Sequence, residues 1–144
     1  MPDPRQILAS PMVTNVLPFH MAIKVEEYVR EDASIPYKDW FDGLSSQAAA
    51  KVTVGKLRME LGNTSGIKWF DGMGEYVIDW GPGYRIYLAK DGDKLIVLFG
   101  GGTKRGQQRD IDKAKELLAE YKARKKEILS NITSKHKGKL NGLD

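Results

Sequence analysis

Four short stretches between Ile67 and Phe99 constrain the fold more than any other part of the sequence. They are rich in β-branched and aromatic residues, mostly alternate between apolar and polar positions, and are separated by turns that contain glycine. The stretches are IKWF, EYVIDW, YRIYLAK and KLIVLF, at residues 67–70, 75–80, 84–90 and 94–99. Because short turns join antiparallel neighbours, this pattern predicts an antiparallel sheet. The last stretch is apolar throughout, which indicates a strand buried on both faces.

Further elements flank these strands. A strand is expected at 23–29, followed by a short helix that begins near Pro36 and by a second helix that Ser45 caps. A long helix with one apolar stripe is expected over 107–129. This order predicts an α+β fold, a twisted antiparallel sheet with two N-terminal helices and one C-terminal helix packed against it. The apolar side of the second helix is expected to comprise Ala48, Ala49, Val52, Val54, Leu57 and Leu61.

Composition divides the chain into three parts. Residues 1–20 carry four prolines, and we expect them to form an extension that orders poorly. Residues 21–129 are expected to form one domain, and residues 130–144 a basic tail. Native translation could start at Met1, Met12 or Met21. The chain has no cysteine, which excludes disulfides, thiolate catalysis and cysteine metal sites. With no run of 18 apolar residues and no secretory signal at its start, we expect a cytoplasmic protein that does not cross a membrane.

Charge is concentrated at the C-terminal end. Residues 1–99 hold 11 Lys/Arg and 13 Asp/Glu, whereas residues 100–144 hold 12 Lys/Arg and 6 Asp/Glu. A basic end on a nearly neutral body favours a polyanionic partner. A solvated lysine-rich helix is the alternative explanation of the same charges.

Two features within this pattern are candidates for binding an anion. Alternation in YRIYL places Arg85 and Tyr87 on the side opposite Tyr84 and Ile86, and we expect that side to be an open face of the sheet. There an arginine would offer a planar fork of donors suited to phosphate. In FGGGTKRGQQ, three glycines and two cations precede a helix whose N-terminus favours an anion. The spacing matches neither a Walker loop nor a dinucleotide-binding loop, and a plain strand-to-helix connection explains it equally well.

Other chemistries have little support in the sequence. The two histidines, His20 and His136, lie in the expected extension and tail, so a histidine pair or a histidine metal site is not expected. We expect neither a metal nor a cofactor. Trp69 and Tyr87 could each lie exposed on the open face of the sheet.

The segments GPGYRIYL, LIVLFGGGTK and RDIDKAKELLAEY occur in an order and spacing that resemble the RelE/HigB toxin superfamily, in its branch of phage-derived addiction-module killer proteins. The resemblance covers about residues 22–124. It implies a small α+β domain that acts as the toxin of a type II toxin–antitoxin pair. Such relatives typically cut mRNA on the translating ribosome, without a metal. The resemblance also implies a cognate antitoxin, often a helix-turn-helix protein, through which the complex binds operator DNA.

The resemblance also implies where the site lies. The strand arginine of the family matches Arg85, the lysine after the glycines matches Lys104, and the glutamate of the preceding strand matches Glu75. Arg85 would stabilise the transition state, Lys104 would hold a phosphate or protonate the leaving oxygen, and Tyr87 or Glu75 would orient or accept the proton. Further RNA- or phosphate-binding residues are expected at Lys68, Arg105, Gln107 and Arg109.

Two departures from the family pattern leave other functions open. Relatives usually carry an arginine where this chain has Val77, and Asp and Ser where it has Thr103 and Arg105. One alternative is a toxin of the same fold with a protein target, as in ParE-like inhibition of DNA gyrase. Another is a catalytically weakened antitoxin or nucleic-acid-binding module.

Overall fold

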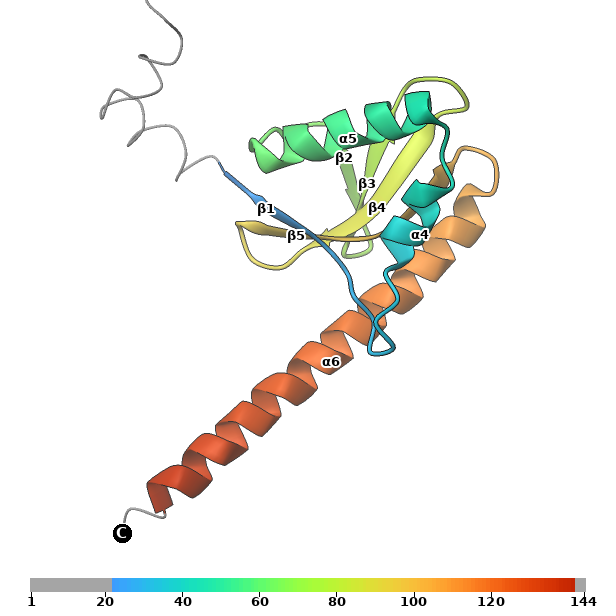
Figure 1. Cartoon of the computed structure of the whole chain (residues 1–144). Helices are drawn as coiled ribbons and strands as arrows, with labels where there is room; N and C mark the ends of the chain where they lie inside the picture. Colours follow the sequence, from blue (N-terminus) through green and yellow to red (C-terminus); the bar gives the residue numbers. More distant parts are fainter. Residues whose placement is uncertain (1–21, 142–144) are drawn as a thin grey trace, which may run out of the picture.

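The computed structural model describes residues 22–141, so the expected extension at residues 1–20 lies outside the described part. The described residues form a five-stranded sheet and three helices (Figure 1). In chain order the elements are β1 (Lys24–Glu27), α4 (Pro36–Asp42), α5 (Ser46–Glu60), β2 (Ile67–Phe70), β3 (Met73–Ile78), β4 (Tyr84–Lys90), β5 (Leu95–Thr103) and α6 (Gln107–Asn141). The expected α+β class is confirmed. A strand occurs at each of the five predicted places, but β3 begins at Met73, two residues earlier than predicted, and β5 continues past Phe99 to Thr103.

The sheet has the strand order β1-β5-β4-β3-β2. As predicted, β2, β3, β4 and β5 pair antiparallel through short turns. The prediction of a wholly antiparallel sheet is wrong at β1, which pairs parallel with β5, Lys24 opposite Leu95. Two helices separate β1 from the other strands, so no tight turn fixes its direction, and long connections of this kind are what parallel pairing requires. The sheet is therefore mixed and open, with β1 and β2 at its edges.

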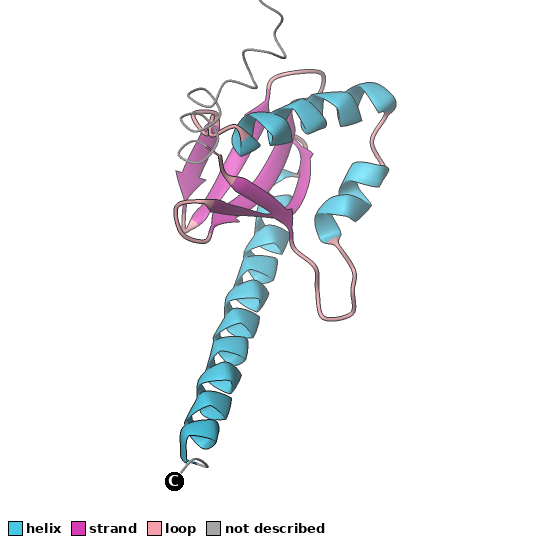
Figure 2. Ribbon diagram, turned by 60° about the vertical axis from the view of Figure 1, so that its left-hand side comes forward, coloured by secondary structure: helices cyan, strands magenta, loops and turns pink. Residues whose placement is uncertain are grey.

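Helices cover both faces of this sheet. Helices α4 and α5 lie on one face and α6 crosses the other (Figures 1 and 2). Under α4 and α5, a buried cluster includes Tyr37, Val52 and Leu98. Under α6, a second cluster includes Tyr87 and Phe99. Strand β5 contributes to both clusters, which confirms the prediction of a strand buried on both faces.

Helix α5 begins as the sequence predicts but turns a different side to the sheet. Ser45 caps it, accepting a hydrogen bond from the backbone nitrogen of Ala48 at 3.2 Å. The helix buries Ala48, Val52, Gly55 and Met59, whereas Val54, Leu57 and Leu61 are exposed. Gly55 explains the difference, because a Cβ atom there would lie 2.8 Å from the ring of Tyr76. Without that atom, the helix lies closely over the Tyr76 ring.

Helix α6 starts at Gln107 as predicted but passes the expected end at Leu129 and continues to Asn141. Most of the segment expected as a tail is therefore helical. Two ion pairs join α6 to loops beside the sheet. Glu120 pairs at 3.0 Å with Arg30, which follows β1, and Lys125 pairs at 2.6 Å with Asp91, which lies in the turn between β4 and β5. Across residues 22–141, no helix combines the length and the apolar character needed to cross a bilayer.

Candidate functional site

The site residues expected from the sequence lie on the face of the sheet that α6 covers. Lys68 is opposite Glu75, and Glu75 is opposite Tyr87, in one row across β2, β3 and β4. Val77 and Arg85 form the next row on the same face. The prediction that Arg85 and Tyr87 share a face is confirmed. The prediction that this face is open is wrong, because the first turns of α6 lie over it.

A buried carboxylate is central to the site. Glu75 is only 2% exposed, and Arg85 beside it has a side chain 12% exposed. The Nε atom of Arg85 lies 3.5 Å from one carboxylate oxygen, and Nε2 of Gln107 donates to the other at 2.8 Å. A buried charge is tolerated only when it is paired and hydrogen-bonded, so these two partners explain how Glu75 stays there. Glu75 thereby connects β4 to the first residue of α6.

The guanidinium of Arg85 also lies where the turn before β4 meets the loop after β5. Its Nη1 atom donates to the carbonyl oxygen of Gly83 at 3.2 Å, and the backbone nitrogen of Lys104 donates to the same oxygen at 3.1 Å. Gly83 holds this turn with φ of +77°, a conformation that favours glycine. The turn between β3 and β4 and the loop between β5 and α6 therefore meet beside Arg85. Arg85 and Lys104 are predictable from the sequence, but the Gly83 carbonyl that they share is not, because no side-chain pattern marks it.

Tyr87 is fully buried beneath α6, contrary to its expected exposure. Its hydroxyl has no hydrogen-bond partner among the described protein atoms. Burial raises the pKa of Tyr87, and the negative charges of Glu75 and Asp110 raise it further. The hydroxyl therefore stays protonated at neutral pH and does not reach the surface.

Two of the three glycines of the loop motif, Gly101 and Gly102, have a packing role. Gly100, Gly101 and Gly102 lie inside β5 and pair with β4, so they do not form an anion-binding turn as the sequence suggested. A Cβ atom on Gly101 would lie 2.5 Å from the ring of Trp40, and one on Gly102 would lie 2.1 Å from Oδ2 of Asp110. Strand β5 thus needs glycine where α4 and α6 approach it closely from opposite faces.

The loop that follows the glycines presents the cations of the site. Lys104 and Arg105 are exposed between β5 and α6, and Arg109 is exposed on the first turns of α6. Lys68 is exposed on β2, on the same face of the sheet as Glu75. The N-terminal end of α6 adds a positive partial charge at this place. Arg85, together with exposed cations on the same face of the sheet and at the start of α6, suits an anionic ligand such as phosphate.

Trp69 and Trp40 lie on the side of the sheet that α4 and α5 cover, and they differ in exposure. Trp69 is exposed, and the amine of Lys90 lies 5.1 Å from its ring centre. Trp40 is partly buried against Gly101. Within residues 22–141, no group of His, Cys, Asp and Glu side chains is arranged to hold a metal ion.

Comparison with known proteins gives this chain a relative. Over 89 residues it is 37% identical to an uncharacterized protein of Haemophilus influenzae, a match that covers 60% of this chain and 90% of that protein. The chain belongs to the family of that protein. No protein-family model matches the chain. This relationship assigns no activity to the chain.

Proposed function

We propose that this protein is the toxin of a type II toxin–antitoxin system and cleaves mRNA on the ribosome without a metal. The resemblance of GPGYRIYL and the following segments to RelE/HigB toxins motivates the proposal. The observation that carries it is the arrangement around Arg85, an arginine clamped by Glu75 and Gly83 beside the backbone of the exposed Lys104. Such a fixed cation can meet charge that develops on a phosphate.

The proposed RNA cleavage develops negative charge on a phosphate, which cationic side chains can stabilise. The ribose 2′-oxygen attacks the adjacent phosphorus, the bond from phosphorus to the 5′-oxygen breaks, and the products carry a 2′,3′-cyclic phosphate and a 5′-hydroxyl. Arg85 would stabilise the extra negative charge of the transition state, and Lys104 would hold a neighbouring phosphate or give a proton to the leaving oxygen. Lys68, Arg105 and Arg109 would bind the RNA backbone.

The geometry changes the roles of two expected catalytic residues. Both oxygens of Glu75 have partners, Arg85 and Gln107, so Glu75 acts in this proposal as a positioning residue that orients Arg85. Gln107 likewise holds Glu75 and is not assigned to RNA. Tyr87 has no role in proton transfer because it is fully buried. The group that removes the proton from the 2′-hydroxyl is then the substrate, the ribosome or water.

A second candidate is a nucleic-acid-binding module with weakened catalysis. Two observations favour it, the burial of Tyr87 and Glu75 and the presence of Val77, 37% exposed, on the strand next to Arg85. An apolar residue there removes a cation that relatives carry. Such a module would keep the basic surface and bind RNA without cutting it.

Cleavage mapping separates these candidates. Expression without an antitoxin is expected to stop incorporation of labelled amino acids, and primer extension is expected to locate cuts within translated mRNA. Arrest without cuts would favour the binding module. Loss of DNA supercoiling while protein synthesis continues would instead indicate a gyrase target. A helix-turn-helix antitoxin that neutralises the arrest and binds operator DNA would support the proposed partners.

A further inference from the structure

Helix α5 carries an apolar side that no described residue buries. Toward the sheet it buries Val52 and Met59, whereas Val54, Leu57 and Leu61 are 45%, 51% and 65% exposed. Their spacing of three and four residues places these three on one side of the helix, and we call them the outer stripe. A helix that faces water usually has a polar outer side. The outer stripe therefore indicates a contact that residues 22–141 do not make.

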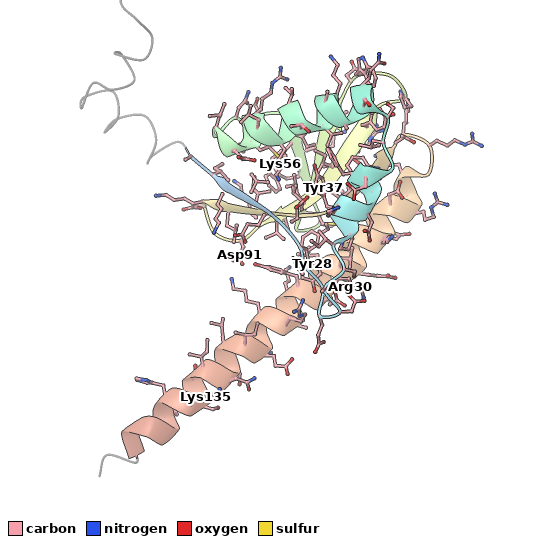
Figure 3. All side chains as sticks on the ribbon, viewed as in Figure 1. Tyr28, Arg30, Tyr37, Lys56, Asp91 and Lys135 are labelled. Atoms are coloured by element: carbon pink, nitrogen blue, oxygen red, sulfur yellow. The ribbon has the colours of Figure 1, made fainter. Side chains whose placement is uncertain are left out.

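A recess adjoins the outer stripe between α5 and the end of β3. It has a volume of about 370 Å³, and its apolar lining comprises Val54, Tyr76, Ile78 and Trp80. Side chains stand out from α5 on the side away from the sheet in Figure 3, where Lys56 is labelled on this helix. The recess and the outer stripe share Val54, so together they form one apolar surface.

Charge on α5 narrows the choice of what can cover this surface. The helix carries three cations, Lys51, Lys56 and Arg58, and one carboxylate, Glu60. Two copies of the chain that met through their outer stripes would bring the cations of both copies together, and like charges repel. A basic segment is disfavoured for the same reason. An uncharged apolar segment meets no such cost, because the long stems of Lys51 and Arg58, which line the recess, can pack against it.

The N-terminal end of the described chain lies beside the outer stripe. The backbone nitrogen of Ile23 donates to the carbonyl oxygen of Glu60 at 3.0 Å, and Leu61 is the next residue. Figure 1 shows β1 starting next to the same end of α5. The sequence that precedes Ile23 is therefore attached to the domain at the stripe.

Residues 7–19, which we call the N-segment, have the composition that this surface requires. They read ILASPMVTNVLPF; seven of these 13 residues are large and apolar, and none is charged. The seven positions from Val54 to Leu61 cover roughly 10 Å along a helix axis, whereas an extended chain of the N-segment's length spans up to about 45 Å. Only residues 20–22 separate the N-segment from Ile23, and so short a tether gives a local concentration of roughly millimolar.

We propose that the N-segment docks on its own chain and covers the outer stripe and the recess beside it. Its apolar side chains then shield Val54, Leu57 and Leu61 from water. A chain translated from Met21 lacks the N-segment, so the choice of start determines whether this surface is covered or free. The contact does not depend on the proposed toxin activity.

Because the chain has no cysteine, a single introduced thiol can report whether the surface is covered. Val54→Cys places a thiol of similar size on the surface, and its rate of reaction with a maleimide is measured in the full chain. Val13→Glu with Val16→Glu, which puts charge into the N-segment, is expected to raise that rate roughly tenfold, the equivalent of about 1.4 kcal/mol of docking free energy. Thr14→Glu with Asn15→Glu adds the same charge at polar positions and is expected to leave the rate low.

Ser130→Cys supplies the control thiol, because Ser130 is exposed on another helix, and we expect it to react at one rate in every variant. Circular dichroism establishes that each variant is folded. A Val54→Cys thiol that reacts no faster with Val13→Glu and Val16→Glu overturns the proposal, as does equal acceleration by the Thr14 and Asn15 pair. Protection that grows with protein concentration also overturns it and indicates that a second copy covers the surface.

Discussion

Glu75 and Arg85 show how a residue predicted on an exposed surface becomes part of a buried pair. They lie diagonally on neighbouring strands of one face, and the first turn of α6 closes over them. Gln107 donates a hydrogen bond to one oxygen of Glu75, and the Nε atom of Arg85 lies 3.5 Å from the other. The ion pair with Glu75 and the hydrogen bond from Nη1 to the Gly83 carbonyl together position the guanidinium, and positioning of this kind favours stabilisation of a transition state. The structural and the proposed functional roles of Arg85 are therefore coupled.

Arg85→Ala is expected to lower the free energy of unfolding by about 3 kcal/mol, because it leaves the buried Glu75 without its charge partner. Urea unfolding followed by circular dichroism measures this. Lys104→Ala is the control, and we expect a change below about 0.5 kcal/mol because Lys104 is exposed. Arg85→Ala combined with Glu75→Gln is expected to recover part of the stability without recovering toxicity. A folded double variant that arrests growth fully would contradict the proposed role of Arg85.

Tyr87→Phe is expected to keep toxicity and to leave stability unchanged or raise it by up to about 1 kcal/mol. The substitution removes a buried hydroxyl that has no partner among the described atoms, so no hydrogen bond is lost. Growth arrest after induction and the urea midpoint are the two measurements. Loss of toxicity in a folded Tyr87→Phe protein would show that the hydroxyl takes part in the reaction.

At the scale of elements, the glycines of β5 determine how closely α4 and α6 approach the sheet. Gly101 contacts the ring of Trp40, which lies in α4, and Gly102 contacts Asp110 in α6. Gly100, which belongs to the same strand, has no atom within 4 Å of the place where a Cβ would lie. The three neighbouring glycines of β5 thus differ in whether the space around them could hold a Cβ atom.

Gly101→Ala is expected to destabilise the protein by about 1–3 kcal/mol, because the added methyl group overlaps the Trp40 ring. Gly100→Ala is the matched control and is expected to have no destabilising effect, since the methyl group enters open space. Thermal unfolding compares the two variants directly. Equal destabilisation by both would mean that the strand itself, and not contact with α4, requires glycine.

Sequence patterns predicted local features of these elements well and their tertiary environment poorly. The Ser45 cap, the start of α6 and the strands around the three turns each follow from residues close together in the chain. The direction of β1 depends on pairing with a strand about 70 residues away. Likewise, the exposure of Tyr87 depends on a helix that begins 20 residues later. For the site, the shared face of Arg85 and Tyr87 was predictable from alternation, but its cover by α6 was not.

For the whole molecule, carboxylates on or facing α6 help to hold the two layers together. Glu120 accepts hydrogen bonds from Arg30 and Tyr28, which lower its pKa. Asp91, in the turn between β4 and β5, accepts from Lys125 and Tyr121, and its pKa is lowered as well. A carboxylate with a lowered pKa stabilises the fold when ionised. That contribution is complete above the unfolded pKa of about 4 and is lost as the pH falls through the folded value.

The protein is therefore expected to lose stability as the pH falls below about 4, with α6 loosening from the β1 edge. Glu120→Gln with Asp91→Asn is expected to be less stable at neutral pH and to show a flatter dependence in acid. Urea unfolding at a series of pH values measures both effects. An unchanged acid dependence in the double variant would assign the pH sensitivity to other carboxylates.

Truncation to residues 21–129 tests whether the fold needs the part of α6 beyond Leu129. Both buried clusters and the residues packed on them lie between Ile23 and Tyr121, so the shortened chain is expected to keep a single cooperative thermal transition. Calorimetry measures the transition, and the full chain is the matched control. Loss of the cooperative transition would show that residues outside 21–129 pack on the core, because removal of the exposed end of α6 alone does not disturb either cluster.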